Sequence, residues 1–258
     1  MTMTENPVFV FVPGAWHTAD TFDVVRDLMH KRGLATKAIS TPSVGACSPD
    51  QGLHADIEYT HAVLKHMVEA GHQVVLVNHS YGGMVGSAAV EGLGYAQRCK
   101  AGLSGGVLMV VWLAAFVTPK GKSLMDMLGG NLLPWMIVKS SEDGYCWSSE
   151  QETVFYNDMS PEEQQSAISK LKPHTLKAFK EPAMHEPWHE MPSMYLFCDQ
   201  DAAIPLSVQE SFAETLGNPV TYHVDASHSA FLSMPDKVID GLEIALKEGR
   251  QQSGIVVN

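Results

Sequence analysis

The stretch Val74–Gly83, VVLVNHSYGG, carries the strongest fold signal in this sequence. Its aliphatic half has the pattern of a buried strand, Ser80 follows that strand closely, and helix-compatible residues resume at Met84. Gly82 and Gly83 are the small residues that such a tight turn needs. The pattern predicts a strand-turn-helix corner that presents a serine hydroxyl above the strand end. The alternative is a serine that only caps a helix.

The rest of the chain alternates β-branched runs with amphipathic segments, which predicts an α/β fold with a mostly parallel sheet of about six strands flanked by helices. We expect strands at Val8–Val12, Ala35–Ile39, Gln73–Val77, Val107–Leu113, Ser193–Cys198 and Pro219–Val224. We expect helices at Ala19–Lys31, Leu53–Glu69, Met84–Gln97, Leu206–Leu216 and Asp236–Lys247.

The alternation of strand-like and helix-like segments stops between residues 118 and 188, where Met, Trp, Pro, Ser and Glu become frequent. Ser160, Pro161 and Glu163 form a helix-start signal within this segment. We therefore predict a core built from residues 1–117 and 189–258, with residues 118–188 inserted as a helical cap.

Composition limits the classes of partner. The 258 residues are 45% hydrophobic and 18% charged, with a formal net charge of −12, so nucleic acid and anionic membranes are not expected partners. The four cysteines are widely spaced, so neither a metal nor another cofactor is expected. The N-terminus lacks the pattern of a secretory signal, which predicts a cytoplasmic protein. A small-molecule substrate is the expected partner, and a homodimer is left open.

Two further polar groups follow later predicted strands. Asp199 and Asp201 come just after one strand, and His228 comes after the last. In a parallel sheet these strand ends share one edge with Ser80. The chain order Ser, Asp, His is that of α/β-hydrolases, in which histidine is the general base for serine and aspartate orients the imidazole.

An acyl-transfer site also needs hydrogen-bond donors for the oxyanion. The first expected donor is the backbone amide of Tyr81, directly after the serine. The second is the amide of Ala15 in the turn VPGAWH, where Gly14 lets the chain bend and Pro13 has no N–H to offer. His17, beside this turn, is expected to make a structural hydrogen bond.

The sequence resembles the plant methyl-esterase and hydroxynitrile-lyase branch of the α/β-hydrolases over nearly its whole length. The resemblance rests on segments spread along the chain: FVFVPGAWHTADTF, VVLVNHSYGGM, VWLAAFVTP, FYNDMSPEEQQSAISKLKP, MYLFCDQDAAIP and DASHSAFLSMP. It implies an α/β-hydrolase fold with a cap, and a triad of Ser80, Asp201 and His228. Asp199 then becomes a turn residue.

Two positions distinguish the esterases from the lyases of this branch. The lyases carry threonine in the first turn and lysine after the catalytic histidine, where this chain has Gly14 and Ser229. The resemblance therefore implies a carboxylesterase-like enzyme. The chain departs from the branch at Pro13, where histidine is usual, and at Asn78, where glycine is usual.

The insert is rich in aromatic residues, most of which we expect to form the core of the cap. Trp135 resembles the substrate-facing tryptophan of the branch, and Gly14, Trp16 and Met184 are also expected to contact the substrate. The predicted function is hydrolysis of a carboxylic ester of a small, apolar or aromatic substrate through an acyl-enzyme. The alternatives are a C–C bond or lactone hydrolase with the same triad, and a non-catalytic ligand receptor.

Overall fold

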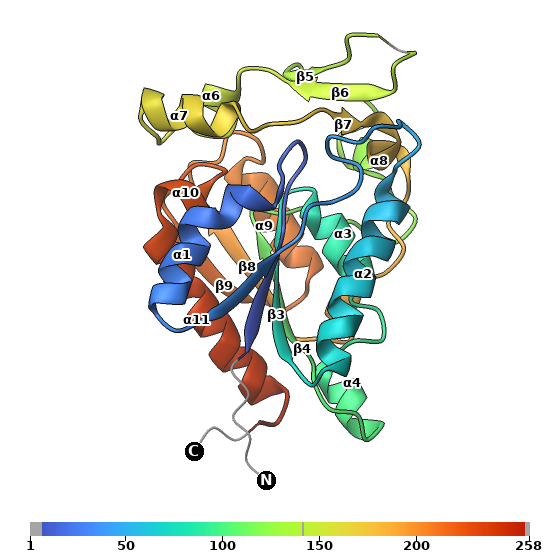
Figure 1. Ribbon diagram of the computed structural model, residues 1–258, viewed down its shortest axis with the longest axis vertical. Coiled ribbons are helices and arrows are strands. Elements are labelled where there is room, and N and C mark those ends of the chain that lie inside the picture. Colours follow the sequence, from blue (N-terminus) through green and yellow to red (C-terminus); the bar gives the residue numbers. More distant parts are fainter. Residues whose placement is uncertain (1–6, 141, 256–258) are drawn as a thin grey trace.

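The computed structural model describes residues 7–140 and 142–255 and is built around one parallel sheet (Figure 1). The sheet has six strands in the order β2-β1-β3-β4-β8-β9, and every neighbouring pair is parallel. The strands are β1 (Val8–Val12), β2 (Ala35–Ala38), β3 (Gln73–His79), β4 (Gly106–Leu113), β8 (Ser193–Cys198) and β9 (Val220–Val224). The predicted sheet is therefore confirmed.

Helices cover both faces of this sheet, as the alternating pattern predicts. The core helices are α1 (Asp23–Lys31), α2 (Leu53–Glu69), α3 (Gly82–Ala89), α4 (Tyr95–Lys100), α9 (Leu206–Thr215), α10 (Ala230–Ser233) and α11 (Pro235–Gln252), with a 3₁₀ turn η1 (Ala19–Phe22) before α1. The single helix expected over Met84–Gln97 is wrong. It is two helices, because Gly92 has a φ of 74° and ends the first of them.

Strand alternation separates the core into two layers. In β1, Phe9 and Phe11 pack with the residues of α1 and α11, whereas Val10 and Val12 pack with those of α2 and α3. These strand residues are buried on both faces, which is typical of parallel sheets. The sheet is thereby a rigid support for the loops at its carboxyl edge.

The order of the strands brings two of those loops together. β1 lies between β2 and β3, so the strands that follow β1 are added first on one side of it and then on the other, and the turns after β1 and β3 are neighbours. The last residue of β1, Val12, pairs in register with Asn78, two residues before Ser80. Such a switch point is where open α/β sheets form ligand sites.

The inserted segment lies over the carboxyl edge of the sheet (Figure 1). It contains α5 (Leu124–Met127), β5 (Met136–Ile137), β6 (Tyr145–Ser148), α6 (Gln151–Val154), α7 (Pro161–Ile168), β7 (His174–Thr175), α8 (Leu176–Lys180) and the 3₁₀ turn η2 (Pro187–His189). The segment expected as a helical cap contains helices and also a small antiparallel sheet of β5, β6 and β7, which was not predicted. The predicted helix start at Ser160 is a complete capping box.

Within the described residues, no helix is both long and apolar enough to cross a bilayer. Most of the N-terminal stretch on which the cytoplasmic prediction rests, residues 1–6, lies outside the described part of the chain.

Candidate active site

Ser80 occupies the corner between β3 and α3 in a left-handed conformation, with a φ of 53°. Its carbonyl accepts hydrogen bonds from the amides of Gly83 (2.9 Å) and Phe116 (3.1 Å). A Cβ at Gly82 would lie 2.6 Å from the carbonyl oxygen of Val12, and one at Gly83 would lie 2.2 Å from that of Phe116. The strained serine conformation therefore depends on both glycines and on a backbone that holds the corner closed.

Asn78 is accommodated by a compensating glycine on the neighbouring helix. A Cβ at Gly86 of α3 would lie 1.9 Å from the Oδ1 atom of Asn78, so the Asn78 side chain uses the space of a missing side chain. Among the described residues, neither polar atom of this buried amide has a hydrogen-bond partner. The asparagine at position 78, where the branch has glycine, is thus accommodated inside the fold and does not line the cavity.

Asp201 and His228 lie in contact at the same edge of the sheet. The Nδ1 atom of His228 is 2.7 Å from Oδ2 of Asp201, and both side chains are buried. Oδ1 of Asp201 accepts hydrogen bonds from the amides of Ala203 (2.7 Å) and Ile204 (2.9 Å). Because a carboxylate only accepts, Nδ1 of His228 carries the proton, and Nε2 is left to accept one.

Asp199 takes a different partner. Its Oδ1 atom lies 2.7 Å from Nδ1 of His223, and the His223 side chain is half exposed. The structure therefore separates the two aspartates of the motif, one facing the site and one at the surface.

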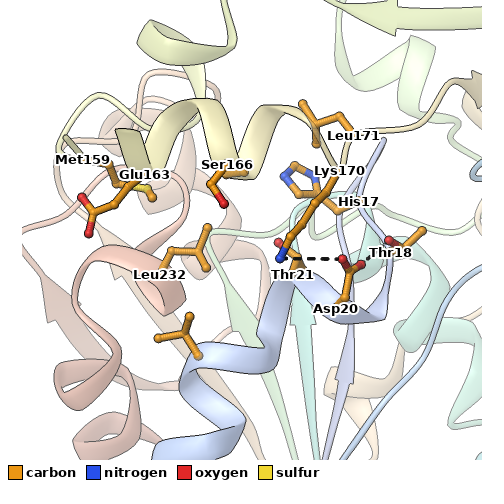
Figure 2. A pocket seen from close by; sticks show the side chains of 12 residues that line it. His17, Thr18, Asp20, Thr21, Met159, Glu163, Ser166, Lys170, Leu171 and Leu232 are labelled. Carbon is orange, nitrogen blue, oxygen red and sulfur yellow. Dashed lines mark hydrogen bonds and ion pairs between the residues drawn. The ribbon is translucent and has the colours of Figure 1, made fainter. Parts of the chain in front are cut away.

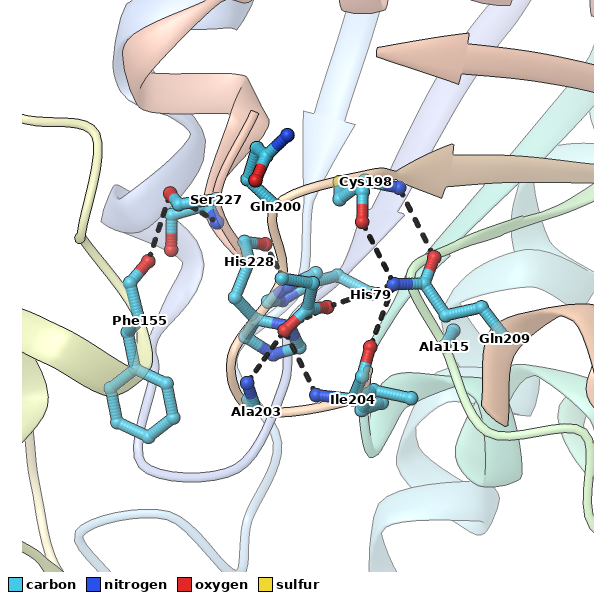
Figure 3. A network of polar contacts seen from close by, with 12 residues as sticks. His79, Ala115, Phe155, Cys198, Gln200, Ala203, Ile204, Gln209, Ser227 and His228 are labelled. Carbon is cyan, nitrogen blue, oxygen red and sulfur yellow. Dashed lines mark hydrogen bonds and ion pairs between the residues drawn. The ribbon is translucent and has the colours of Figure 1, made fainter. Parts of the chain in front are cut away.

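Two buried side chains, Gln209 and His79, stabilise the loops that carry Asp201 and His228 (Figure 3). Neither was predicted from the sequence. Nε2 of Gln209, on α9, donates to the carbonyls of Ile204 (2.8 Å) and Cys198 (3.0 Å) and lies 3.3 Å from Oδ2 of Asp201. Nε2 of His79 donates to the backbone carbonyl of His228 at 3.0 Å. No local sequence signal marks Gln209, whereas His79 could have been suspected from its place beside Ser80.

Ser80 and His228 line one narrow cavity of about 30 Å³ beneath the cap. The amides proposed as oxyanion donors belong to Ala15 and Tyr81, and both residues line this cavity too. Its remaining walls are largely apolar and come from Trp16, His17, Phe116, Leu124, Leu128, Leu133, Trp135, Met136, Phe155, Ala203 and Ile204.

Two of the expected substrate contacts do not match their positions in the structure. Met184 is 48% exposed and is not part of the cavity wall, because its segment runs along the surface between α8 and η2. Gly14 is also not part of the cavity wall, and a Cβ there would be 2.8 Å from the Cβ of Ser80 and 3.0 Å from Nδ1 of His79. A side chain at position 14 would therefore require one of these neighbours to shift.

A second group of Ser, His and Asp side chains lies between the core and the cap, and we call it the cap-core cluster. Asp56 of α2 accepts hydrogen bonds from the hydroxyls of Ser43 (2.5 Å) and Tyr81 (2.7 Å). Nε2 of His174, on β7, lies 2.7 Å from the Ser43 hydroxyl. Ser43, Asp56 and His174 are completely buried and are absent from the wall of the cavity that holds Ser80. Sequence reasoning did not find this cluster.

The cap-core cluster is strongly desolvated. Burial raises the pKa of Asp56 to about 6, against hydrogen bonds from Ser43 and Tyr81 that lower it. Burial also lowers the pKa of His174 to about 3, so this imidazole is neutral. Because Asp56 contacts the serine and not the histidine, no carboxylate supports a charged His174.

A larger cavity of about 230 Å³ lies between α7 of the cap and the η1 and α1 region of the core (Figure 2). His17 belongs to the walls of both cavities and so lies between them. Lys170 and Asp20 form an ion pair at 3.9 Å in the wall of the larger one. Across the described residues, no group of three or more His, Cys, Asp or Glu side chains is placed to hold a metal ion.

The parallel sheet, the strained serine after β3 and the buried Asp-His pair at the same edge define a hydrolase of the α/β class. A sequence model described as the alpha/beta hydrolase family matches residues 9–240. The chain is 30% identical over 239 residues to the alpha/beta hydrolase nvfD of Aspergillus novofumigatus, covering 91% of this chain and 94% of that protein. The protein belongs to the α/β-hydrolase family and is an esterase-like enzyme.

More distant relatives agree with this assignment. A pyrethroid hydrolase of Sphingobium wenxiniae is 25% identical over 256 residues, with 94% of this chain and 87% of that protein covered. Among solved structures, polyneuridine aldehyde esterase has a TM-score of 0.75 at 18% identity, with 93% of this chain and 99% of that one covered. The methylesterase MES16 from Arabidopsis has a TM-score of 0.73 at 21% identity over the same shares of the two chains.

Proposed function

We propose that this protein is a serine carboxylesterase that cleaves an ester of a small, apolar or aromatic substrate through an acyl-enzyme. The observation that carries the proposal is the 2.7 Å contact between His228 and Asp201, beside a cavity that Ser80 also lines. The names of the similar proteins, which include an esterase and a methylesterase, support ester hydrolysis.

The first half-reaction follows from the protonation state of His228. Its free Nε2 takes the proton of the Ser80 hydroxyl as the oxygen attacks the ester carbonyl, and Asp201 stabilises the imidazolium that forms. The amides of Ala15 and Tyr81 donate to the developing oxyanion. His228 then gives its proton to the departing alkoxide, which leaves an acyl group on Ser80.

The second half-reaction uses the same groups on water. His228 takes a proton from a water molecule that attacks the acyl carbonyl, and as the tetrahedral intermediate collapses His228 returns that proton to the departing Ser80 oxygen, which releases the acid and restores the hydroxyl. Every proton transfer is accounted for by one histidine.

The cavity supports the preference for a small apolar acyl group. Its walls are mostly aliphatic and aromatic, and its volume is only about 30 Å³, so the larger the acyl group, the more cap side chains such as Trp135 would have to move. We expect no cyanohydrin cleavage, because Ser229 offers no cation to a departing cyanide and burying an unpaired anion is costly.

A screen of methyl and p-nitrophenyl esters with acyl chains of increasing length tests the proposal. We expect turnover by the wild-type protein, best with short acyl groups, and turnover lower by about 10⁴-fold in Ser80→Ala. Turnover of lactones or C–C substrates in place of esters would redirect the proposal to another reaction of the same triad, and unchanged ester turnover by Ser80→Ala would refute it.

A further inference from the structure

The turn that carries Ala15 is strained at its next residue. Trp16 is buried and has a φ of 65°, in the left-handed region that bulky side chains rarely adopt. Such a conformation persists only where the surroundings hold it in place. The contacts of this turn therefore decide whether the Ala15 amide can act as an oxyanion donor.

The cap supplies most of those contacts. The indole Nε1 of Trp16 donates to the carbonyl of Cys146 in β6 at 3.0 Å. The amide of Lys172, also in the cap segment, donates to the carbonyl of Trp16 at 2.9 Å. Both groups bind Trp16 from residues more than a hundred positions away in the sequence, so the cap stabilises the shape of the turn.

His17 provides a third link between turn and cap. Its Nδ1 lies 2.7 Å from the carbonyl of Ala15, and because a carbonyl only accepts, Nδ1 carries the proton. Burial lowers the pKa of His17 to about 4, so the ring is neutral and Nε2 must accept. The hydroxyl of Tyr156, 2.8 Å away, is the donor that Nε2 requires.

Hydrogen bonds at both ring nitrogens orient the buried His17 ring, which also packs edge-on against Phe155 and Tyr156. His17 lies in the wall of the larger cavity (Figure 2). The backbone amide of His17 also donates to the carbonyl of Gly14 at 3.3 Å. Since C=O and N–H point in opposite directions in a trans peptide, this bond fixes the direction of the Ala15 N–H.

We propose that Tyr156 and His17 are positioning residues that lock the Ala15 oxyanion donor to the cap, so that seating of the cap completes the oxyanion hole. The proposal rests on the proposed esterase function. Neither residue touches the reacting atoms in this scheme. Tyr156 acts on the reaction through His17, and His17 acts through the backbone of the turn.

Tyr156→Phe tests this proposal, because it removes one hydroxyl and keeps the ring. We expect kcat for a short p-nitrophenyl ester to fall by about 10- to 100-fold with KM changed by less than about threefold, since an oxyanion donor acts on the transition state. The affinity for an alkylboronic acid, which forms a tetrahedral adduct with the serine, should fall in parallel. The affinity for the carboxylic acid product should not change.

Tyr145→Phe is the matched control. The hydroxyl of Tyr145 donates to the carbonyl of Ala46 at 3.0 Å, so it also makes a hydrogen bond between cap and core, but its partner is not a residue of the oxyanion turn. We expect kcat and boronic acid affinity of this variant to stay within about twofold of wild type, because no group near Ala15 is altered.

The outcomes separate the positioning role from a structural one. Equal losses of kcat in both variants, or unchanged kcat and boronic acid affinity in Tyr156→Phe, would overturn the proposal even where Ser80→Ala is inactive. Turnover retained by Ser80→Ala would instead refute the esterase mechanism itself, so the two failures are distinguishable.

Discussion

Two regions of this molecule bring together a serine, a histidine and an aspartate, and they differ in which side chain the aspartate binds. At the sheet edge, Asp201 holds Nδ1 of His228, and the histidine and Ser80 line a cavity. In the cap-core cluster, Asp56 binds the Ser43 hydroxyl directly, and among the described residues that hydroxyl is the hydrogen-bond partner of the His174 ring, whose Nδ1 has none.

The order of contacts decides the chemistry in each region. A carboxylate bonded to histidine stabilises the imidazolium that forms when serine is deprotonated. A carboxylate bonded to serine holds the serine proton itself and leaves the histidine without a counter-charge. The cap-core cluster is therefore structural: it ties β7 of the cap to α2 of the core, and through Tyr81 it also reaches the serine corner.

The largest expected difference is between the two serines. Ser80→Ala should lower kcat/KM for a short ester by about 10⁴-fold while the protein stays folded, because only binding and oxyanion stabilisation remain. Ser43→Ala should retain kcat/KM within about tenfold but lower the free energy of unfolding by about 1–3 kcal/mol, since the buried Asp56 loses one hydroxyl donor. Steady-state kinetics measure kcat/KM, and urea unfolding measures stability. A larger loss of kcat/KM in Ser43→Ala than in Ser80→Ala would mean that the cap-core cluster is the catalytic one.

A second difference is expected between two aspartates only two residues apart. Asp201→Asn should reduce kcat by about 10³-fold or more, because an amide cannot hold and charge-stabilise the imidazole as a carboxylate does. Asp199→Asn should change kcat by less than about threefold, since its partner His223 is half exposed. A severe loss in Asp199→Asn would show that the acid has been misplaced.

The buried Asp56 of the cap-core cluster should make the free energy of unfolding depend on pH. Burial raises the pKa of Asp56 from 3.8 to about 6, so the folded state favours its protonated form. That contribution to stability is present below about pH 4 and is lost as the pH rises through about 6. Over this range wild type should lose on the order of 3 kcal/mol of unfolding free energy relative to Asp56→Asn. If the unfolding free energies of the two proteins, measured with urea, changed with pH in parallel, the raised pKa of Asp56 would be contradicted.

The smallest expected effect concerns the shape of the sheet-edge cavity. Trp135→Ala should change the ratio of kcat/KM between long-chain and short-chain esters by about 10- to 100-fold in favour of the long chain, because it removes part of the cavity wall. Turnover of the short ester should persist. Equal losses on all chain lengths would instead make Trp135 a residue of cap stability.

Local patterns were sufficient to predict the sheet and the chemical groups at its edge. The run before Ser80, the positions of Asp201 and His228 after later strands, and the turn at Ala15 are all readable, because parallel strands place their carboxyl ends together. The choice of Asp201 over Asp199 came from the family resemblance, and the geometry agrees with it.

The features that were missed depend on contacts between distant segments. His174 meets Ser43 across 131 positions of the sequence, and no local pattern indicates such a pair. The strands of the cap sheet are two to four residues long, too short for a detectable alternation. Met184 was misplaced because an apolar side chain in a cap sequence does not reveal which way it faces.

Covalent labelling tests the central distinction most directly. The wild-type protein is treated with a fluorophosphonate, which reacts with activated serine hydroxyls, and the modified peptide is identified by mass spectrometry. We predict one adduct, on Ser80, with loss of esterase activity in proportion to labelling, and no adduct on the buried Ser43. An adduct on Ser43, or full activity after complete labelling of Ser80, would contradict the account.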